Sequence, residues 1–372
     1  MTSQVDYDLH GIVGIRLLNA TPKDIAVVTR QLGPIQSLLA REPDIVIRFV
    51  DQLRTASRVR YLGLDDVGFT DDAFLVLHTK HHARVKVQIP FEKIGQQCEI
   101  ICERGLPAIP LIIPILNITA LKNGALPLHA SAFNYRDLGI VMTGWSKGGK
   151  TETLLAFMAN GAEYVGDEWV YLSGDGQRMF GIPQPIRIWD WHLDYLSQYR
   201  ALLGWSDRTK LRTWRLLADG MNQVRINGRG RHLFPVNMIS RILPLLKKQT
   251  HVDWPPEQLF GQSSCSLQGT PDKIFFVASH EAVDVTIQPI DPQIIAQRMV
   301  FSLQEEQMKL ISYYRKFRFA FPTAANELIE QSESLQRQTL ARVLSGKDAY
   351  AVYHPYPVPI QSLFDTIRPY CN

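Results

Sequence analysis

The feature that most constrains this chain of 372 residues is the segment Gly-Trp-Ser-Lys-Gly-Gly-Lys-Thr at residues 144–151. It matches the pattern G-x-x-x-x-G-K-[ST] completely, and by average residue usage a chance match is expected in only about one chain of this length in a hundred. The apolar run at 138–142 precedes it, and Thr151 opens an apolar helical stretch that ends near Gly161. A strand, a glycine loop and a helix in this order predict a loop that cradles phosphates.

The residue types in this loop suit that chemistry. Gly144, Gly148 and Gly149 let successive backbone N–H groups turn toward phosphates, and the helix N-terminus adds its positive dipole. Lys150 is expected between the β- and γ-phosphates, and the Thr151 hydroxyl is expected to bind Mg²⁺. The other residues assigned to the nucleotide-binding loop are Trp145, Ser146 and Lys147. The loop therefore predicts that the chain binds ATP, or another nucleoside triphosphate, with Mg²⁺; the alternative is a glycine-rich turn before a buried helix.

Such a site also needs a carboxylate. The apolar strand expected at 273–279 is followed by His280 and Glu281 rather than by an Asp, which makes it a weak source. The nearer pair Asp167-Glu168 follows the helix that leaves the loop. A β-α-β crossover predicts a strand at 168–172 alongside the strand that enters the loop, with the acidic pair at its edge.

Three features recur around the loop: Leu-His129-Ala fifteen residues before it, Gly-Lys-Thr-Glu152 within it, and the acidic pair after Tyr-Val-Gly. Together they resemble the catalytic domain of HPr kinase/phosphorylase and the wider group of HPr-kinase-like serine kinases, which are related to the phosphoenolpyruvate carboxykinases. The resemblance covers residues 120–190, and more loosely the chain out to about 300. It implies an α/β fold with a P-loop kinase core of the HPr kinase type.

The resemblance also implies roles for individual residues. Asp167 would be the general base on the acceptor hydroxyl, Glu168 would hold Mg²⁺ directly or through water, and His129 would lie near the γ-phosphate. Glu152 would belong to the nucleotide-binding set. The chain departs from the family pattern because Glu168 stands where Asp is common. Residues 1–95 do not match the family's usual N-terminal domain, so HPr itself is not the expected substrate.

Two arginines are candidate clamps for phosphate or substrate. Arg187 lies in Pro-Gln-Pro-Ile-Arg-Ile, which loosely occupies the place of the family's kinase/phosphorylase signature. Arg229 lies in a basic glycine turn, which an exposed loop explains equally well.

The chain divides into a small α+β domain at 1–95 and a catalytic domain at 100–372. A buried helix is expected between them at 100–125. Within the catalytic domain, the segment near 189–250 is rich in Trp, Arg and Leu at partly helical spacing, and a C-terminal helical region runs from about 292 to 345. This spacing predicts a helical insertion whose aromatic residues pack in a core rather than stack on nucleic-acid bases.

Composition and charge limit the possible classes of function but do not identify one. The net charge of +4 suits an anionic small molecule and does not single out nucleic acid, which is not the expected partner. Cys98 and Cys102 have a ligand-like separation, but no second Cys/His pair completes a zinc site, so reduced thiols are favoured. The N-terminus lacks the pattern of a signal peptide, and the apolar stretch at 105–121 is short and contains prolines. A cytoplasmic protein that does not enter the membrane is expected, and a homo-oligomer is left open.

Two hypotheses for function follow. The first is a kinase that transfers the γ-phosphoryl group of ATP to a hydroxyl of an unidentified small molecule, peptide or protein. The second is a nucleotide-gated regulatory or interaction module, which would use the loop to sense ATP and the helical insertion to engage a partner. Asp167 discriminates between them, because a kinase needs a proton acceptor and a sensor does not.

Overall fold

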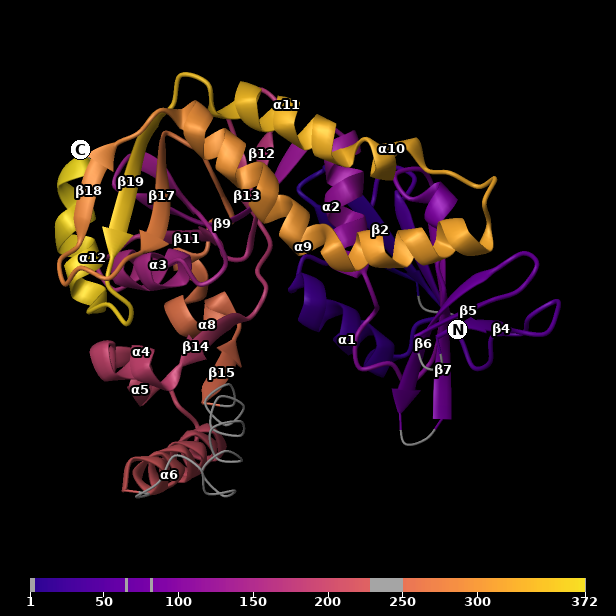
Figure 1. Cartoon of the computed structure of the whole chain (residues 1–372), viewed down its shortest axis with the longest axis horizontal. Helices are drawn as coiled ribbons and strands as arrows, with labels where there is room; N and C mark the ends of the chain where they lie inside the picture. The colour runs from indigo at the N-terminus through magenta and orange to yellow at the C-terminus, as the bar shows by residue number, and fades with distance from the viewer. Residues whose placement is uncertain (1–3, 64–65, 81–82, 228–249, 372) are drawn as a thin grey trace.

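The computed structural model of the chain describes residues 4–63, 66–80, 83–227 and 250–371. These residues form a mixed α/β protein, as the sequence predicts, with two lobes that are each built on a mixed sheet (Figure 1). Among the described residues, no helix combines the length and the apolar character needed to cross a membrane.

The first lobe is an eight-stranded sheet in the order β1-β2-β3-β8-β7-β6-β5-β4, in which β2, β3 and β8 are parallel and the other neighbours antiparallel. Its strands are β1 (Val5–Leu9), β2 (Val13–Leu18), β3 (Ile45–Val50), β4 (Arg60–Leu62), β5 (Val67–Phe69), β6 (Phe74–Lys80), β7 (Ala83–Gln88) and β8 (Cys98–Glu103). Its helices are α1 (Pro22–Leu32), the single turn η1 (Phe91–Lys93) and α2 (Ile112–Lys122). The sheet therefore extends beyond residue 95. The expected buried helix is present over the shorter span of α2, because residues 98–103 pair as a strand with β3.

The second lobe is a nine-stranded sheet in the order β16-β13-β12-β9-β10-β17-β19-β18, with β11 also paired to β9. Its strands are β9 (Ala125–Tyr135), β10 (Leu138–Thr143), β11 (Glu163–Gly166), β12 (Trp169–Ser173), β13 (Met179–Gly181), β16 (Gln268–Gly269), β17 (Lys273–Ser279), β18 (Thr286–Pro289) and β19 (Asp348–His354). The helices α3 (Lys150–Met158) and α12 (Ile360–Ile367) pack on one face, and α9 (Pro292–Ala320) and α11 (Ser332–Leu344) pack on the other. The short α10 (Glu327–Glu330) joins α9 to α11, and η3 (Arg368–Tyr370) follows α12.

One expectation about this sheet is wrong. The crossover predicts β12 next to β10, but β9 lies between them. The reason is the length of β9, whose eleven residues pair with β10 along one edge and with both β11 and β12 along the other. One strand therefore lies between the strand that follows the acidic pair and the strand that enters the glycine loop at 144–151.

An arm extends from the second lobe below α3 (Figure 1). It consists of β14 (Ile186–Trp189), α4 (Asp190–Tyr195), α5 (Ser197–Ala201), α6 (Trp205–Asn227), β15 (His251–Trp254), α8 (Pro256–Phe260) and the turn η2 (Gln262–Ser264). Within the segment near 189–250, for which helices are expected, the described residues contain α4, α5 and α6 together with the strand residues of β14. Arg229 lies outside the described residues.

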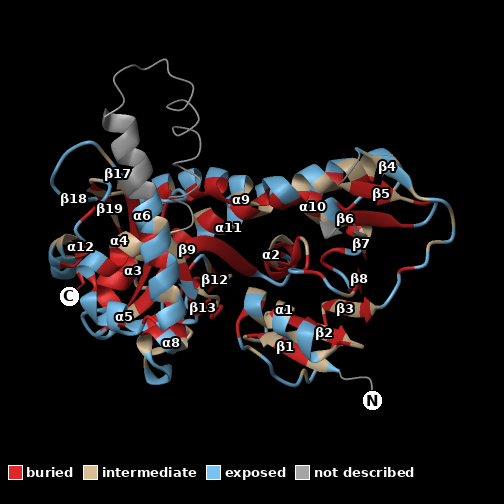
Figure 2. Cartoon of the chain, turned by 90° about the horizontal axis from the view of Figure 1, so that it is seen from below, coloured by how far each residue is buried: buried red, intermediate tan, exposed pale blue. Residues whose placement is uncertain are grey.

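The two lobes share one apolar core. Residues of the first sheet pack in the same cluster as Tyr171 and Phe180 of the second sheet and Leu310, Tyr314 and Phe317 of α9. Helix α9, about 43 Å long at 1.5 Å per residue, runs across both lobes. Its buried and exposed residues alternate along its length (Figure 2). This helix connects the neighbourhood of the phosphate loop to the first lobe.

Candidate functional site

The glycine loop joins the C-terminal end of β10 to the N-terminal end of α3, in the middle of the second sheet. Gly144 and Gly149 have φ of +152° and +104°, in the region that favours glycine. A Cβ at Gly144 would lie 2.3 Å from the Val277 carbonyl oxygen, and one at Gly149 would lie 2.1 Å from Nε2 of His354. Both positions therefore require glycine for backbone conformation and for space.

Lys150 closes this loop on itself. Its Nζ donates hydrogen bonds to the carbonyl oxygens of Trp145 at 2.9 Å and Gly144 at 3.2 Å, and the side chain is buried. Burial lowers the pKa of Lys150, although the charges of nearby carboxylates oppose this effect. By contrast, Trp145, Ser146 and Lys147 are exposed at the mouth of the loop.

Asp167 and Glu168 interrupt the edge of the sheet. β11 and β12 pair with the same edge of β9, and the two acids lie between the last pair of β11 and the first pair of β12, where the Ala130 N–H donates to the Glu168 carbonyl oxygen at 3.3 Å. The register shift along this edge comes earlier, between Tyr164 and Gly166. Glu168 has φ of +65°, an uncommon conformation for a residue with a side chain. Here the interruption sends the two carboxylates to different partners.

Asp167 contacts the phosphate-loop helix. Its two carboxylate oxygens lie 3.1 and 3.3 Å from the Thr151 hydroxyl, which donates to them. The side chain is buried. Burial, reinforced by the negative charge of Glu168, raises the pKa of Asp167 to about 7. The carboxylate beside Thr151 is thus Asp167 and not Glu168, the residue that the resemblance implies for the metal.

Glu168 instead contacts His129. The Oε2 atom of Glu168 lies 3.1 Å from Nε2 of the buried imidazole, while 63% of the Glu168 side chain is exposed. Oε1 of Glu306, on α9, lies 3.1 Å from Nδ1 of the same ring, at ion-pair distance but without the alignment of a hydrogen bond. Burial alone would lower the pKa of His129, but the two carboxylates outweigh it and raise the pKa. The hydrogen bond with His129 is the main reason that the pKa of Glu168 is lowered.

Glu152 contacts the arm. Its Oε1 lies 3.3 Å from Nε2 of His192 on α4, and both side chains are largely buried. Nδ1 of His192 accepts a hydrogen bond from the backbone N–H of Trp189, so Nε2 carries the proton and donates to Glu152. Glu152 therefore ties the phosphate-loop helix to the arm.

The structure adds two residues that the sequence does not single out. His354, at the end of β19, is fully buried, and its Nε2 lies 2.8 Å from the carbonyl oxygen of Gly148. Glu306 completes the environment of His129. Neither lies in a motif, and each comes from an element more than 150 residues away from its partner. Only the folded sheet brings them to the loop.

The remaining sequence candidates have other surroundings. Arg187 is half-exposed and pairs with Asp253 at 3.1 Å, and its charge contributes to the lowered pKa of Glu168, after His129 and Lys150. His280 lies 3.0 Å from the carbonyl oxygen of Asp284, and Glu281 is exposed. Cys98 and Cys102 are buried free thiols whose pKa is raised by burial, to about 12 for Cys98.

The described residues contain no group of three or more His, Cys, Asp or Glu side chains arranged to hold a metal ion. Thr151 and Asp167 nevertheless form a pair of hard oxygen donors at the start of α3. Mg²⁺ commonly uses one or two protein oxygens and takes its other ligands from phosphates and water. The pair therefore fits a cation that arrives with a nucleotide.

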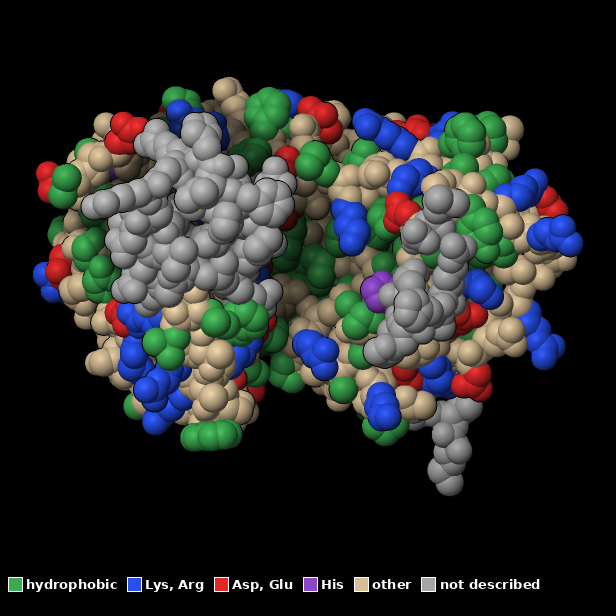
Figure 3. All heavy atoms as spheres, turned by 60° about the horizontal axis from the view of Figure 1, so that its bottom comes forward, with side chains coloured by type: hydrophobic (Ala, Val, Ile, Leu, Met, Phe, Trp, Pro, Cys, Tyr) green, Lys and Arg blue, Asp and Glu red, His purple; other side chains and the backbone are tan. Residues whose placement is uncertain are grey.

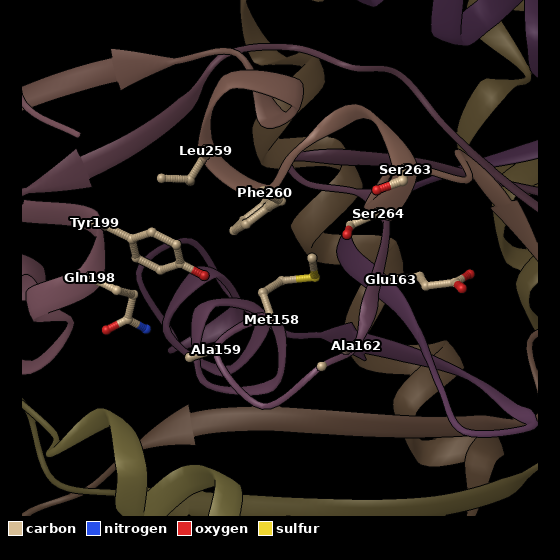
Figure 4. A pocket seen from close by; sticks show the side chains of 11 residues that line it. Met158, Ala159, Ala162, Glu163, Gln198, Tyr199, Leu259, Phe260, Ser263 and Ser264 are labelled. Carbon is tan, nitrogen blue, oxygen red and sulfur yellow. The ribbon is translucent and has the colours of Figure 1, made fainter. Parts of the chain in front are cut away.

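A cavity of about 420 Å³ is found at the opposite end of α3 from the loop, between Met158, Tyr199 and Phe260 (Figure 4). It contains none of the residues of the candidate site. On the face that carries the arm, the surface is also hollowed between the two lobes (Figure 3).

Comparisons with protein-family models and with curated proteins find no match for this chain. The loop, the two acids and the residues that surround them are therefore the features of this chain that bear on function.

The raised pKa of Asp167 has a consequence for stability. In the unfolded chain this carboxyl loses its proton near pH 3.8, whereas the folded protein keeps it until about pH 7, so stability without nucleotide falls as the pH rises across this interval. Asp167→Asn removes the penalty. We expect the variant to melt roughly 2–5 °C above the wild type at pH 8 and by a smaller margin at pH 5. Melting curves without Mg²⁺ test this, and an equal gain at both values would contradict it.

Proposed function

We propose that the chain is a phosphotransferase with a P-loop kinase core of the HPr kinase type. It would bind ATP, or another nucleoside triphosphate, with Mg²⁺ and transfer the γ-phosphoryl group to a hydroxyl acceptor. The single observation that carries the proposal is the placement of two carboxylates, Asp167 and Glu168, against the end of a glycine loop that contains Lys150. A loop alone supports nucleotide binding, but transfer to a hydroxyl also needs a proton acceptor.

In this proposal Thr151 and Asp167 hold the cation. Their contact at 3.1 Å and the high pKa of the buried carboxyl support it, because a cation would compensate the unfavourable charge of an ionised Asp167. Bound Mg²⁺ would neutralise negative charge on the transferring phosphoryl group. Lys150 would leave the loop carbonyls of Gly144 and Trp145 and donate to the phosphates instead.

Glu168 is then the proposed general base. It is the more exposed of the two acids, and the hydrogen bond with His129 lowers its pKa, so it is ionised at neutral pH. It would take the proton of the acceptor hydroxyl as the new O–P bond forms and the bond between the β- and γ-phosphates breaks, which releases the nucleoside diphosphate. This division of work reverses the roles that the family resemblance implies for the two acids.

A second candidate function has its own support. The contact between Glu152 and His192 joins the phosphate-loop helix directly to the arm, so nucleotide binding could alter the arm without any transfer. The protein would then be a nucleotide-gated interaction module. Such a module needs the loop, Thr151 and Glu152, but it has no use for a base at Glu168.

Transfer of label decides between them. The protein is incubated with Mg²⁺, γ-labelled ATP and a fractionated cell extract, beside a sample labelled on the α-phosphate and a Glu168→Gln sample. We expect a product that carries the γ-label, lacks the α-label and is absent with the variant. Nucleotide binding in calorimetry without any labelled product would favour the sensor, and the absence of nucleotide binding would refute both.

A further inference from the structure

His129 lies between two carboxylates that come from distant parts of the chain. The imidazole is on β9, Glu168 is in the interruption between β11 and β12, and Glu306 is on α9. Each ring nitrogen has one carboxylate oxygen at 3.1 Å, Nε2 that of Glu168 and Nδ1 that of Glu306. Because the ring is buried, these two contacts define its polar surroundings.

Glu306 lies on α9 between two stretches of the helix that are each buried in a different core. Met299 and Leu303, before it on α9, are buried against the second sheet. Leu310 and Tyr314, after it, are buried in the core shared with the first lobe. The backbone of Glu306 can therefore neither slide nor tilt without disturbing two cores, and its side chain starts from a fixed place relative to β9.

We propose that Glu306 is a positioning residue that sets the ring orientation of His129, so that Nε2 faces Glu168. The inference rests on the proposed function, in which Glu168 is the base. A histidine has two ring nitrogens, and the partner of one determines what the other can offer. With Nδ1 beside Glu306, a flip of the ring would place a carbon against that carboxylate, so the contact favours the orientation in which Nε2 holds the Glu168 carboxylate where an acceptor hydroxyl would meet it. Among the described residues, Glu306 makes no hydrogen bond or ion pair with the loop or with Glu168, although its charge acts on the pKa of Lys150.

At metal sites, loss of a residue that orients a metal ligand commonly lowers activity or metal affinity by about 10- to 100-fold. We expect a loss of activity of similar size when Glu306 no longer orients His129. Glu306→Ala should lower kcat by roughly 10- to 100-fold, while the affinity for Mg-nucleotide stays within about twofold of the wild type. Glu306→Gln keeps a side-chain oxygen that can accept from Nδ1, so it should recover most of the rate. Glu305→Ala is the matched control, because this neighbouring glutamate is exposed on the same helix.

A second measurement reports on the ring without any turnover. Protein with ¹⁵N-labelled histidine is observed by NMR, with the His129 signals assigned by their loss in His129→Gln. In the wild type and in Glu306→Gln, Nδ1 should have the shift of a protonated nitrogen. In Glu306→Ala its shift or its proton exchange should change, while Glu305→Ala leaves it as in the wild type.

The two measurements separate the inference from the function on which it rests. If no acceptor is ever phosphorylated but the Nδ1 signal depends on Glu306, the orientation is correct and the kinase assignment fails. If transfer occurs and Glu306→Ala leaves both kcat and the Nδ1 signal unchanged, Glu306 does not position the ring. Equal loss of kcat and of thermal stability in Glu306→Ala and Glu306→Gln would also refute the inference, because it would indicate a merely structural role.

Discussion

Replacing Glu168 with Gln is expected to reduce the rate of phosphoryl transfer by roughly two to four orders of magnitude, which is the usual contribution of a positioned general base. The amide keeps the size of the side chain and can still contact His129, but it cannot take a proton. Mg-nucleotide should bind about as tightly as before, because Lys150 and the loop supply that affinity. Single-turnover transfer and calorimetric titration, performed side by side, measure the two quantities.

Asp167→Asn is the matched comparison for this experiment. If Asp167 and Thr151 hold the cation, the variant should need a higher Mg²⁺ concentration for both nucleotide binding and turnover, and Thr151→Ala should behave alike. Glu168→Gln should keep the wild-type Mg²⁺ dependence. The reverse result, in which Asp167→Asn binds Mg-nucleotide normally but does not turn over, would restore the roles implied by the family resemblance.

Replacing Lys150 with Ala is expected to weaken Mg-nucleotide binding by on the order of 10- to 100-fold, the effect of losing hydrogen bonds from a charged donor. The fold should persist, since among the described residues the Nζ atom donates its hydrogen bonds to two carbonyls of its own loop. Calorimetry gives the affinity, and circular dichroism checks the fold.

Lys147→Ala is the control for this substitution. Lys147 lies in the same loop and carries the same charge, but its side chain is exposed. It should lose much less affinity, by a few-fold at most through weaker long-range attraction. Equal losses in the two variants would mean that general positive charge, and not the buried ammonium of Lys150, accounts for binding. Unchanged binding in a folded Lys150→Ala protein would remove the loop from the nucleotide site.

The parts of this site that are local in sequence could be predicted, and the parts that depend on sheet order could not. The strand, loop and helix at 138–158 follow from apolar runs and glycines that are adjacent in the chain. The hairpin that places His129 before the loop is local as well. The position of β9 between β10 and β12 was missed because a crossover pattern does not record how many strands it spans.

The division of the acidic pair between two partners depends on backbone geometry that no sequence pattern encodes. Asp167 and Glu168 are adjacent and chemically alike, and only the left-handed conformation of Glu168 turns one toward Thr151 and the other toward His129. Glu306 and His354 lie in a helix and a strand whose local sequences are ordinary. Their proximity to the loop is a property of the tertiary fold alone.

The shared core limits how gene segments that encode this protein can recombine. A gene fragment that began after β8 would encode α9 but not the first sheet. Tyr314 and Phe317 of α9, which pack against that sheet, would then be exposed. Recombination at that junction would therefore yield a chain with an exposed aromatic surface, and the segment that carries Glu306 would lose its support. We therefore expect that the first lobe cannot be replaced by an unrelated domain without loss of this shared core. We expect the first lobe and the lobe that contains the loop to evolve together, because substitutions in either lobe must remain compatible with packing against α9.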